Sequence, residues 1–90
     1  MYIVILKPSA ERAFEKLSKD VQTQIISVLV QLESDAKPHG SKKLEGSTGL
    51  RRMRTGDYRV IYALPDADQV IFVPLVGHRR EVYRRLDRLR

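Results

Sequence analysis

The first third of the chain begins with a short apolar run and continues with apolar residues at helical spacing. Residues 2–6 predict one strand, which Lys7-Pro8-Ser9 ends. Ser9 is a candidate N-cap for the helix that follows. The apolar positions of that helix are Ala10, Ala13, Phe14 and Leu17. A strand followed directly by an amphipathic helix is therefore expected here.

A second, longer helix is expected to begin at Ser18 or Asp20. Its apolar stripe consists of Val21, Ile25, Val28, Leu29 and Leu32. Two consecutive helices predict a helical hairpin. The segment Ser34–Gly49 holds one proline and three glycines among polar residues, so it should be a surface loop that carries Lys42 and Lys43.

The second half of the chain changes to the pattern of strands. Strands are predicted over Leu50–Arg54, Tyr58–Leu64 and Val70–Val76, with good turn residues between them. They form a three-stranded meander, in which Pro74 implies a bulge or a one-sided edge because proline cannot donate to the ladder. In the tail, Arg79–Arg90, three apolar residues recur at helical spacing among arginines, which predicts a short basic helix. Those three are Val82, Leu86 and Leu89.

These elements give the order β-α-α-β-β-β-α and an α+β fold, with a small antiparallel sheet packed against the N-terminal helical hairpin. A chain of 90 residues has room for one modest core, so residues 1–90 are expected to form a single domain. No apolar run approaches the ~20 residues that cross a bilayer, and the first residues lack the pattern of a signal peptide. We therefore expect a cytoplasmic protein without a membrane partner.

Composition narrows the chemistry. The chain has no cysteine, which excludes disulfides and thiol catalysis, and its two histidines, His39 and His78, are too far apart in sequence to suggest a metal site. No cofactor and no metal are expected. The net charge is +6, and residues 51–90 hold ten arginines, no lysine and five acidic residues. Arginine binds phosphate bidentately and stacks on bases, so phosphate is the favoured ligand. A basic face that only adds solubility or contacts an acidic protein remains the alternative.

The first arginine cluster lies in the predicted meander. If Gly56-Asp57 form a two-residue turn, Arg54 faces Arg59 across the hairpin, and Arg52 shares their side of the sheet. Like charges directly opposite each other destabilise a sheet, and these strands contain no acidic residue that would relieve them. A polyanion would do so. The alternative is three solvated arginines on an outer face.

The second cluster, residues 77–83, adds groups for acid-base chemistry. RNA can be cut without a metal when a 2′-hydroxyl attacks the neighbouring phosphate, which needs a base, cations for the developing charge and an acid for the leaving oxygen. His78, Arg79 and Tyr83 are candidates for these tasks. Two alternatives stay open, namely that Tyr83 faces the core and that His78 caps a helix or serves as another hydrogen-bonding side chain.

These residues resemble the RelE/ParE superfamily of bacterial and archaeal toxins. The resemblance rests on Lys43-Leu44-Glu45-Gly46, on residues 50–62 with Gly56-Asp57-Tyr58-Arg59-Val60-Ile61-Tyr62, and on Gly77-His78-Arg79 through Tyr83. It covers nearly the whole chain. Similarity to the RelE branch implies a microbial-RNase-like fold and a ribosome-dependent endoribonuclease that cuts mRNA in the ribosomal A site and inhibits translation.

The same resemblance implies roles for individual residues. Arg59 matches the arginine at the scissile phosphate, Arg79 the second catalytic arginine and Tyr83 the tyrosine near the C-terminus, while His78 is a substitute acid or base. Leu50 stands where the best-known RelE pattern has a lysine. The residues expected to bind RNA are Arg51, Arg52, Arg54, Arg80, Lys42 and Lys43.

A toxin of this kind implies a RelB-like antitoxin, small and largely acidic, and a toxin–antitoxin complex that binds operator DNA through the antitoxin. The other implied partners are the ribosome and mRNA. Two rival functions remain: a ParE-like inhibitor of DNA gyrase without nuclease activity, and a passive module that binds RNA or the ribosome.

Overall fold

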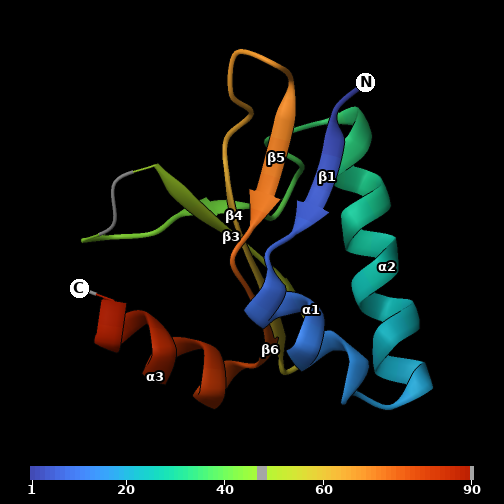
Figure 1. Cartoon of the computed structure of the whole chain (residues 1–90), viewed down its shortest axis with the longest axis vertical. Helices are drawn as coiled ribbons and strands as arrows, with labels where there is room; N and C mark the ends of the chain where they lie inside the picture. Colours follow the sequence, from blue (N-terminus) through green and yellow to red (C-terminus); the bar gives the residue numbers. More distant parts are fainter. Residues whose placement is uncertain (47–48, 90) are drawn as a thin grey trace.

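Three helices pack around two small sheets in the computed structural model, which describes residues 1–46 and 49–89 (Figure 1). The order is β1 (Ile3–Leu6), α1 (Pro8–Glu15), α2 (Lys19–Ser34), β2 (Lys42–Lys43), β3 (Leu50–Thr55), β4 (Tyr58–Ala63), β5 (Val70–Val73), β6 (Leu75–His78) and α3 (Arg79–Leu89). The expected loop and C-terminal helix extend into residues 47, 48 and 90, which lie outside the described residues, as does the side chain of Leu89.

The strands divide between two sheets. One is a four-stranded antiparallel sheet in the order β2-β3-β4-β6, and the other pairs β1 with β5 in parallel. The α+β class, the antiparallel sheet and the N-terminal helices are therefore confirmed. Lys42 and Lys43 were expected in a loop, but they form β2 and pair with Arg52 and Arg51. Two polar residues carry no alternating pattern, so this strand could not be predicted from the sequence.

Pro74 separates two strands that the sequence pattern joined into one. Only β6 extends the meander by pairing with β4, whereas β5 pairs with β1, so the predicted continuous strand Val70–Val76 is wrong. Proline has no N–H to donate, and Pro74 stands where the chain passes from one sheet to the other. Ser9 Oγ donates to the Pro74 carbonyl at 3.3 Å, which ties α1 to this crossing.

The two N-terminal helices begin differently. Lys7, and not Ser9, is the N-cap of α1; it has no side-chain cap, and Pro8 occupies the first turn, where a missing N–H costs nothing. Ser18 caps α2 as expected, because its hydroxyl accepts the N–H of Val21 at 3.4 Å. α1 packs against β6, and α2 packs against β1, β3 and β4. The helices therefore cover one face of the antiparallel sheet and the parallel pair.

The core has two parts, one on each face of the antiparallel sheet. The larger joins α1 and α2 to Met53, Val60, Tyr62, Val76 and the parallel pair, and the smaller lies under α3. The members of the smaller part are Leu44, Ile61, Leu75, Val82 and Leu86, with Leu50 packed against them. β4 is thus buried on both sides, and its Tyr62 hydroxyl is satisfied by the Ala36 carbonyl at 2.8 Å.

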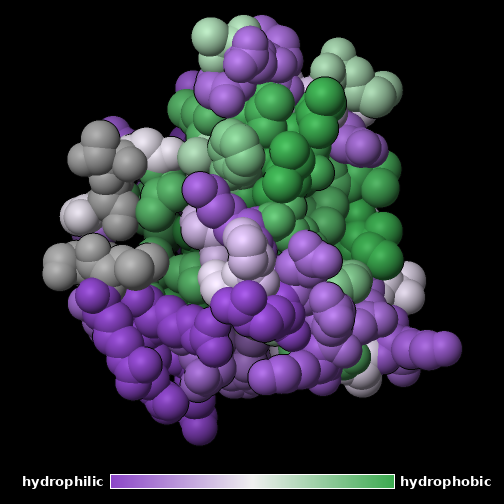
Figure 2. Space-filling model, viewed as in Figure 1, coloured by the Kyte–Doolittle hydropathy of each residue, from purple (hydrophilic) through white to green (hydrophobic). Residues whose placement is uncertain are grey.

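Hydrophobic and hydrophilic residues are separated on the face of the molecule that Figure 2 shows. Figure 2 shows hydrophobic residues gathered over β1 and β5 and hydrophilic residues over α3 and α1. Ile3 and Ile5 of β1 are 60% and 42% exposed. Among residues 1–46 and 49–89, no helix is long and apolar enough to pass through a bilayer.

Candidate nucleic-acid interface

A row of arginines lies on the sheet face that α3 covers. In the β3–β4 hairpin, Arg54 pairs with Arg59 and Arg52 pairs with Ile61, so the predicted register is confirmed and the three arginines share one face. Gly56, with φ +59°, provides the turn that sets this register. Lys42 pairs with Arg52 and joins the same face. We call Lys42, Arg52, Arg54 and Arg59 the cationic row.

Arg51 and Lys43 lie on the opposite face, since successive residues of a strand point to opposite sides. Arg51 Nη2 donates to Ser41 Oγ at 2.9 Å, and its Nε is buried without a hydrogen-bond partner in the described part of the chain. The structure therefore does not bring these two predicted RNA-binding residues together with the cationic row.

Arg59 differs from the other members of the row because it is buried, with 7% of its surface exposed. Its Nη1 donates to the carbonyls of Gly56 at 2.9 Å and Tyr58 at 3.0 Å, which braces the hairpin turn from inside. Its Nε is buried and finds no acceptor among the described residues. A buried, unpaired donor on a charged group is costly, and the described residues do not offset this cost for Arg59 Nε.

The helix α3 lies over the same face and presents two different flanks. Val82 and Leu86 are 1% and 2% exposed and pack against Ile61 and Leu75. Glu81 and Arg85 line a cavity beside α1, next to the edge strand β6. Residues four apart share a side of a helix, so Arg79 and Tyr83 lie together on the other flank, over the inner strands.

Tyr83 is 36% exposed, so the interpretation that its side chain faces the core is wrong. Among the described residues its hydroxyl makes no hydrogen bond. Arg79 is exposed as well, and its backbone N–H donates to the Asp57 carbonyl at 2.8 Å, which fastens the start of α3 to the hairpin turn. The predicted pair Arg79 and Tyr83 therefore stands on a helix end that is fixed relative to the cationic row.

His78 has a structural task. Its Nδ1 accepts the backbone N–H of Arg80 at 3.2 Å, as a capping side chain does, and its ring meets Tyr58 edge-on at 5.6 Å. His78 pairs with Tyr58, one residue along from the Gly77–Arg59 pair, so its side chain projects from the face opposite the cationic row. The helix-capping interpretation of His78 is confirmed. Arg80 is exposed on the outer side of α3.

A second group of cations, which was not expected from the sequence, lies between α1 and α3. Arg12 of α1 and Lys16, the C-cap of α1, line the same cavity as Arg85 of α3. Their spacing was visible in the sequence, but the approach of α3 to α1 was not. Among the residues described, no group of three or more histidine, cysteine or acidic side chains is placed to hold a metal ion.

The α+β fold, the cationic row and the exposed tyrosine of α3 agree with the resemblance to toxins of the RelE/ParE type. The family model described as "ParE toxin of type II toxin-antitoxin system, parDE" matches residues 4–83. The chain belongs to this family, and it is a type II toxin of the RelE/ParE superfamily. No curated protein sequence matches the chain.

Solved structures agree with this assignment. The archaeal RelE–RelB complex from Pyrococcus horikoshii OT3 matches with 31% identity and a TM-score of 0.74, over 87% of this chain and 94% of that chain. The isolated E. coli RelE toxin matches with 26% identity and a TM-score of 0.77, over 100% of both chains. The intact E. coli RelBE toxin–antitoxin complex matches with 25% identity and a TM-score of 0.77, over 87% of this chain and 96% of that chain.

Proposed function

We propose that this toxin is a ribosome-dependent endoribonuclease that cuts mRNA in the ribosomal A site, without a metal, and so stops translation in the cytoplasm. The observation that carries the proposal is that α3, which bears Arg79 and Tyr83, packs on the same face of the sheet as the cationic row. The paired strands of this sheet contain no acidic residue, so an RNA backbone would neutralise the row.

The reaction needs only positioned protons and charges. The 2′-oxygen loses its proton to a base and forms a bond to the adjacent phosphorus, and the bond from phosphorus to the 5′-oxygen then breaks. The products are a 2′,3′-cyclic phosphate and a 5′-hydroxyl, whose proton comes from an acid or from water. Cations that bind the pentavalent phosphate lower the barrier, each by about 10²- to 10³-fold in rate.

Tyr83 is our candidate for the base, because its hydroxyl is accessible and unengaged among the described residues. Arg79, four residues earlier on the same flank, would bind the phosphate that Tyr83 serves. Arg59 would contribute charge from beneath through a guanidinium that the turn already holds in place. His78 acts in this proposal as a positioning residue, since its Nδ1 caps α3.

A RelB-like antitoxin is the proposed partner, with operator DNA bound by the complex through the antitoxin. The matching structure from Pyrococcus horikoshii and the intact E. coli RelBE structure are complexes of toxin with antitoxin. The charge of +6 offers an acidic partner an electrostatic target. Because α3 is held to the sheet largely by Val82 and Leu86, a partner that displaced this helix would carry Tyr83 away from the cationic row.

Inhibition of DNA gyrase is the second candidate, since the matching family model is that of ParE toxins. An inhibitor that works by binding needs no base and no phosphate-binding row. The arginines and Tyr83 would then serve as contacts with the enzyme, and cleavage of RNA would be absent.

One preparation of folded, full-length toxin, assayed for two activities, separates these functions. Cleavage of mRNA on purified ribosomes, with DNA supercoiling by gyrase unaffected, is the expected result. Loss of supercoiling with intact mRNA would reject the nuclease in favour of the gyrase inhibitor. Ribosome binding without cleavage would leave a passive binding module.

A further inference from the structure

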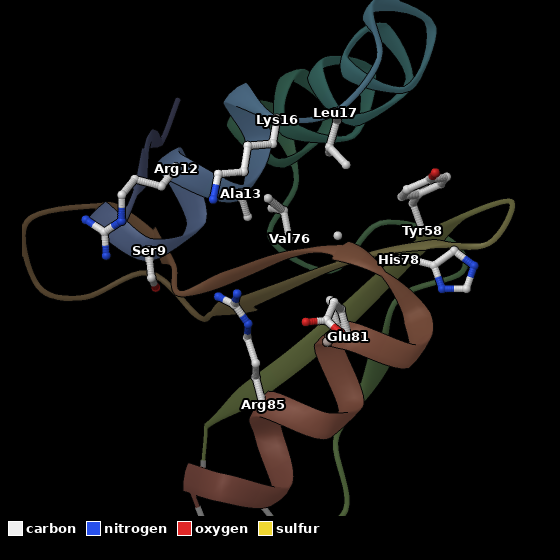
Figure 3. Close-up of a pocket in the computed structure, with 12 residues that line it drawn as sticks. Ser9, Arg12, Ala13, Lys16, Leu17, Tyr58, Val76, His78, Glu81 and Arg85 are labelled. Atoms are coloured by element: carbon white, nitrogen blue, oxygen red, sulfur yellow. The ribbon is translucent and has the colours of Figure 1, made fainter.

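A cavity of about 470 Å³ lies between α1 and α3, over the edge strand β6 and away from the flank of Arg79 and Tyr83. Apolar residues of all three elements line it, together with cationic and aromatic side chains, and Figure 3 shows the arrangement. Its volume falls within the range of roughly 300 to 1,000 Å³ that is usual for small-molecule sites. None of the residues in the cationic row lines it.

The two ends of this cavity differ in chemistry. Figure 3 shows Arg12, Lys16 and Arg85 toward one end, where Ser9 also lies, and Tyr58 with His78 toward the other. The hydrogen bond between Ser9 and the Pro74 carbonyl places the first end near the start of β6. The edge-on contact of Tyr58 with His78 places the second at the end of β6. The cavity therefore has a cationic end and an aromatic end.

The charge at the cationic end is not neutralised within the described chain. Arg12, Lys16 and Arg85 form no salt bridge there, and Glu81, the acidic residue of the lining, pairs with Arg84 at 3.1 Å. A neighbouring cavity shares Ser9, Glu81 and Arg85 and adds further arginines. Cations held close together in a partly enclosed space repel one another, and an anion would relieve that repulsion.

We propose that this cavity binds a nucleoside phosphate, with the base at the Tyr58 end and the phosphate among Arg12, Lys16 and Arg85. Bases stack on aromatic side chains, and guanidinium groups bind phosphate bidentately, so the two ends match the two parts of one ligand. A free nucleotide and a terminal nucleotide of an RNA strand share this chemistry. An acidic peptide would use the cationic end but leave the aromatic end without a counterpart.

The site goes beyond the nuclease proposal, because it uses the other flank of α3. A direct test is to titrate the folded toxin with each of the four nucleoside 5′-monophosphates. Binding is monitored through the NMR chemical shifts of Leu17 and Val82, which line the cavity. The same titration with the free nucleosides, inorganic phosphate, a 5′-phosphorylated trinucleotide and a polyglutamate peptide defines the parts that are recognised. R12Q and R85Q remove one cation each, and K16Q is available if either fails to fold. K37Q, at an exposed lysine that lines neither this cavity nor its neighbour, is the matched control.

Saturable shifts with a monophosphate are expected. The affinity should fall about tenfold in R12Q or R85Q, or when the ligand lacks its phosphate, and it should be unchanged in K37Q. If the monophosphate binds more tightly than the trinucleotide, the ligand is a free nucleotide. If the trinucleotide binds more tightly, the ligand is the terminal nucleotide of an RNA strand. Three results would overturn the proposal: no saturable binding, an equal loss of affinity in K37Q, or binding of polyglutamate without binding of any nucleotide. The last would make the cavity a protein-docking site.

Discussion

Arg54 and Arg59 lie directly opposite each other across the β3–β4 hairpin, one exposed and the other buried. Two like charges in one cross-strand pair cost stability, and the strands carry no acidic residue to offset them. The pair can be explained if this face of the antiparallel sheet binds an anion. The exposed member would contact the ligand, while the buried member fixes the turn.

The cost of this pair predicts that Arg54→Gln stabilises the free toxin. Removing the exposed charge should raise the free energy of unfolding by about 0.2–1 kcal/mol. Urea denaturation measures this change in the free energy of unfolding. The matched control is Arg88→Gln, which replaces an exposed arginine of α3. A less stable Arg54→Gln variant, beside an unchanged control, would show that the Arg54 guanidinium contributes to the fold.

Arg59→Ala, in contrast, should lower the stability of the toxin. The substitution removes both hydrogen bonds to the turn carbonyls and leaves space around a buried side chain, so we expect a loss of about 2 kcal/mol in the free energy of unfolding. Arg52→Ala, on the same face, should change it far less. Equal stability of Arg59→Ala and the parent would contradict the bracing role, and activity measured with Arg59→Ala has to be corrected for its folded fraction.

The two faces of β3 predict different effects for neighbouring arginines. Arg52→Gln should weaken binding of single-stranded RNA and lower the slope of log K against log salt by about one unit, because one phosphate contact is lost. Arg51→Gln should leave that slope unchanged, since Arg51 lies on the other face and donates to Ser41. Fluorescence anisotropy with 2′-O-methyl RNA, which lacks the attacking hydroxyl, measures binding without cleavage. Equal slopes for the two variants would place the RNA elsewhere.

His78 should be replaceable by another capping residue. His78→Ala should lose about 0.5–2 kcal/mol of stability with the cap, and His78→Asn should recover most of it because asparagine caps well. If His78 only positions α3, His78→Asn also keeps cleavage close to that of the parent on ribosomes. A stable His78→Asn protein with cleavage reduced a hundredfold or more would instead make His78 an acid or base.

Local patterns predicted the parts of this fold that depend on neighbours in sequence. The register of Arg54 with Arg59 followed from the Gly56-Asp57 turn, and the start of α2 followed from Ser18. The pairing of β5 with β1 could not be read in the same way, because an apolar strand does not specify which strand it joins. Pro74 marked an interruption without showing that the chain changes sheets there.

In the candidate site, too, local patterns predicted some features, while others depend on how distant elements pack. Arg52, Arg54 and Arg59 share a face by strand alternation alone, which the sequence contains. The burial of Arg59 and the capping contact of His78 depend on where α3 starts and how it lies on the sheet. The resemblance to RelE supplied roles for these residues, but it did not indicate that Arg59 would be tied to its own turn.

In the proposed reaction, Arg79 and Tyr83 perform RNA cleavage beside the cationic row. Primer extension on ribosomes stalled with a defined A-site codon, after addition of each purified toxin variant, tests it most directly. We predict cuts within that codon by the parent and by Arg88→Gln, and a decrease of at least about a hundredfold for Arg79→Gln and for Tyr83→Phe with ribosome binding retained. Full cleavage by both of these variants would show that Arg79 and Tyr83 are not catalytic, and no cleavage by the folded parent toxin would show that it is not a ribosome-dependent nuclease.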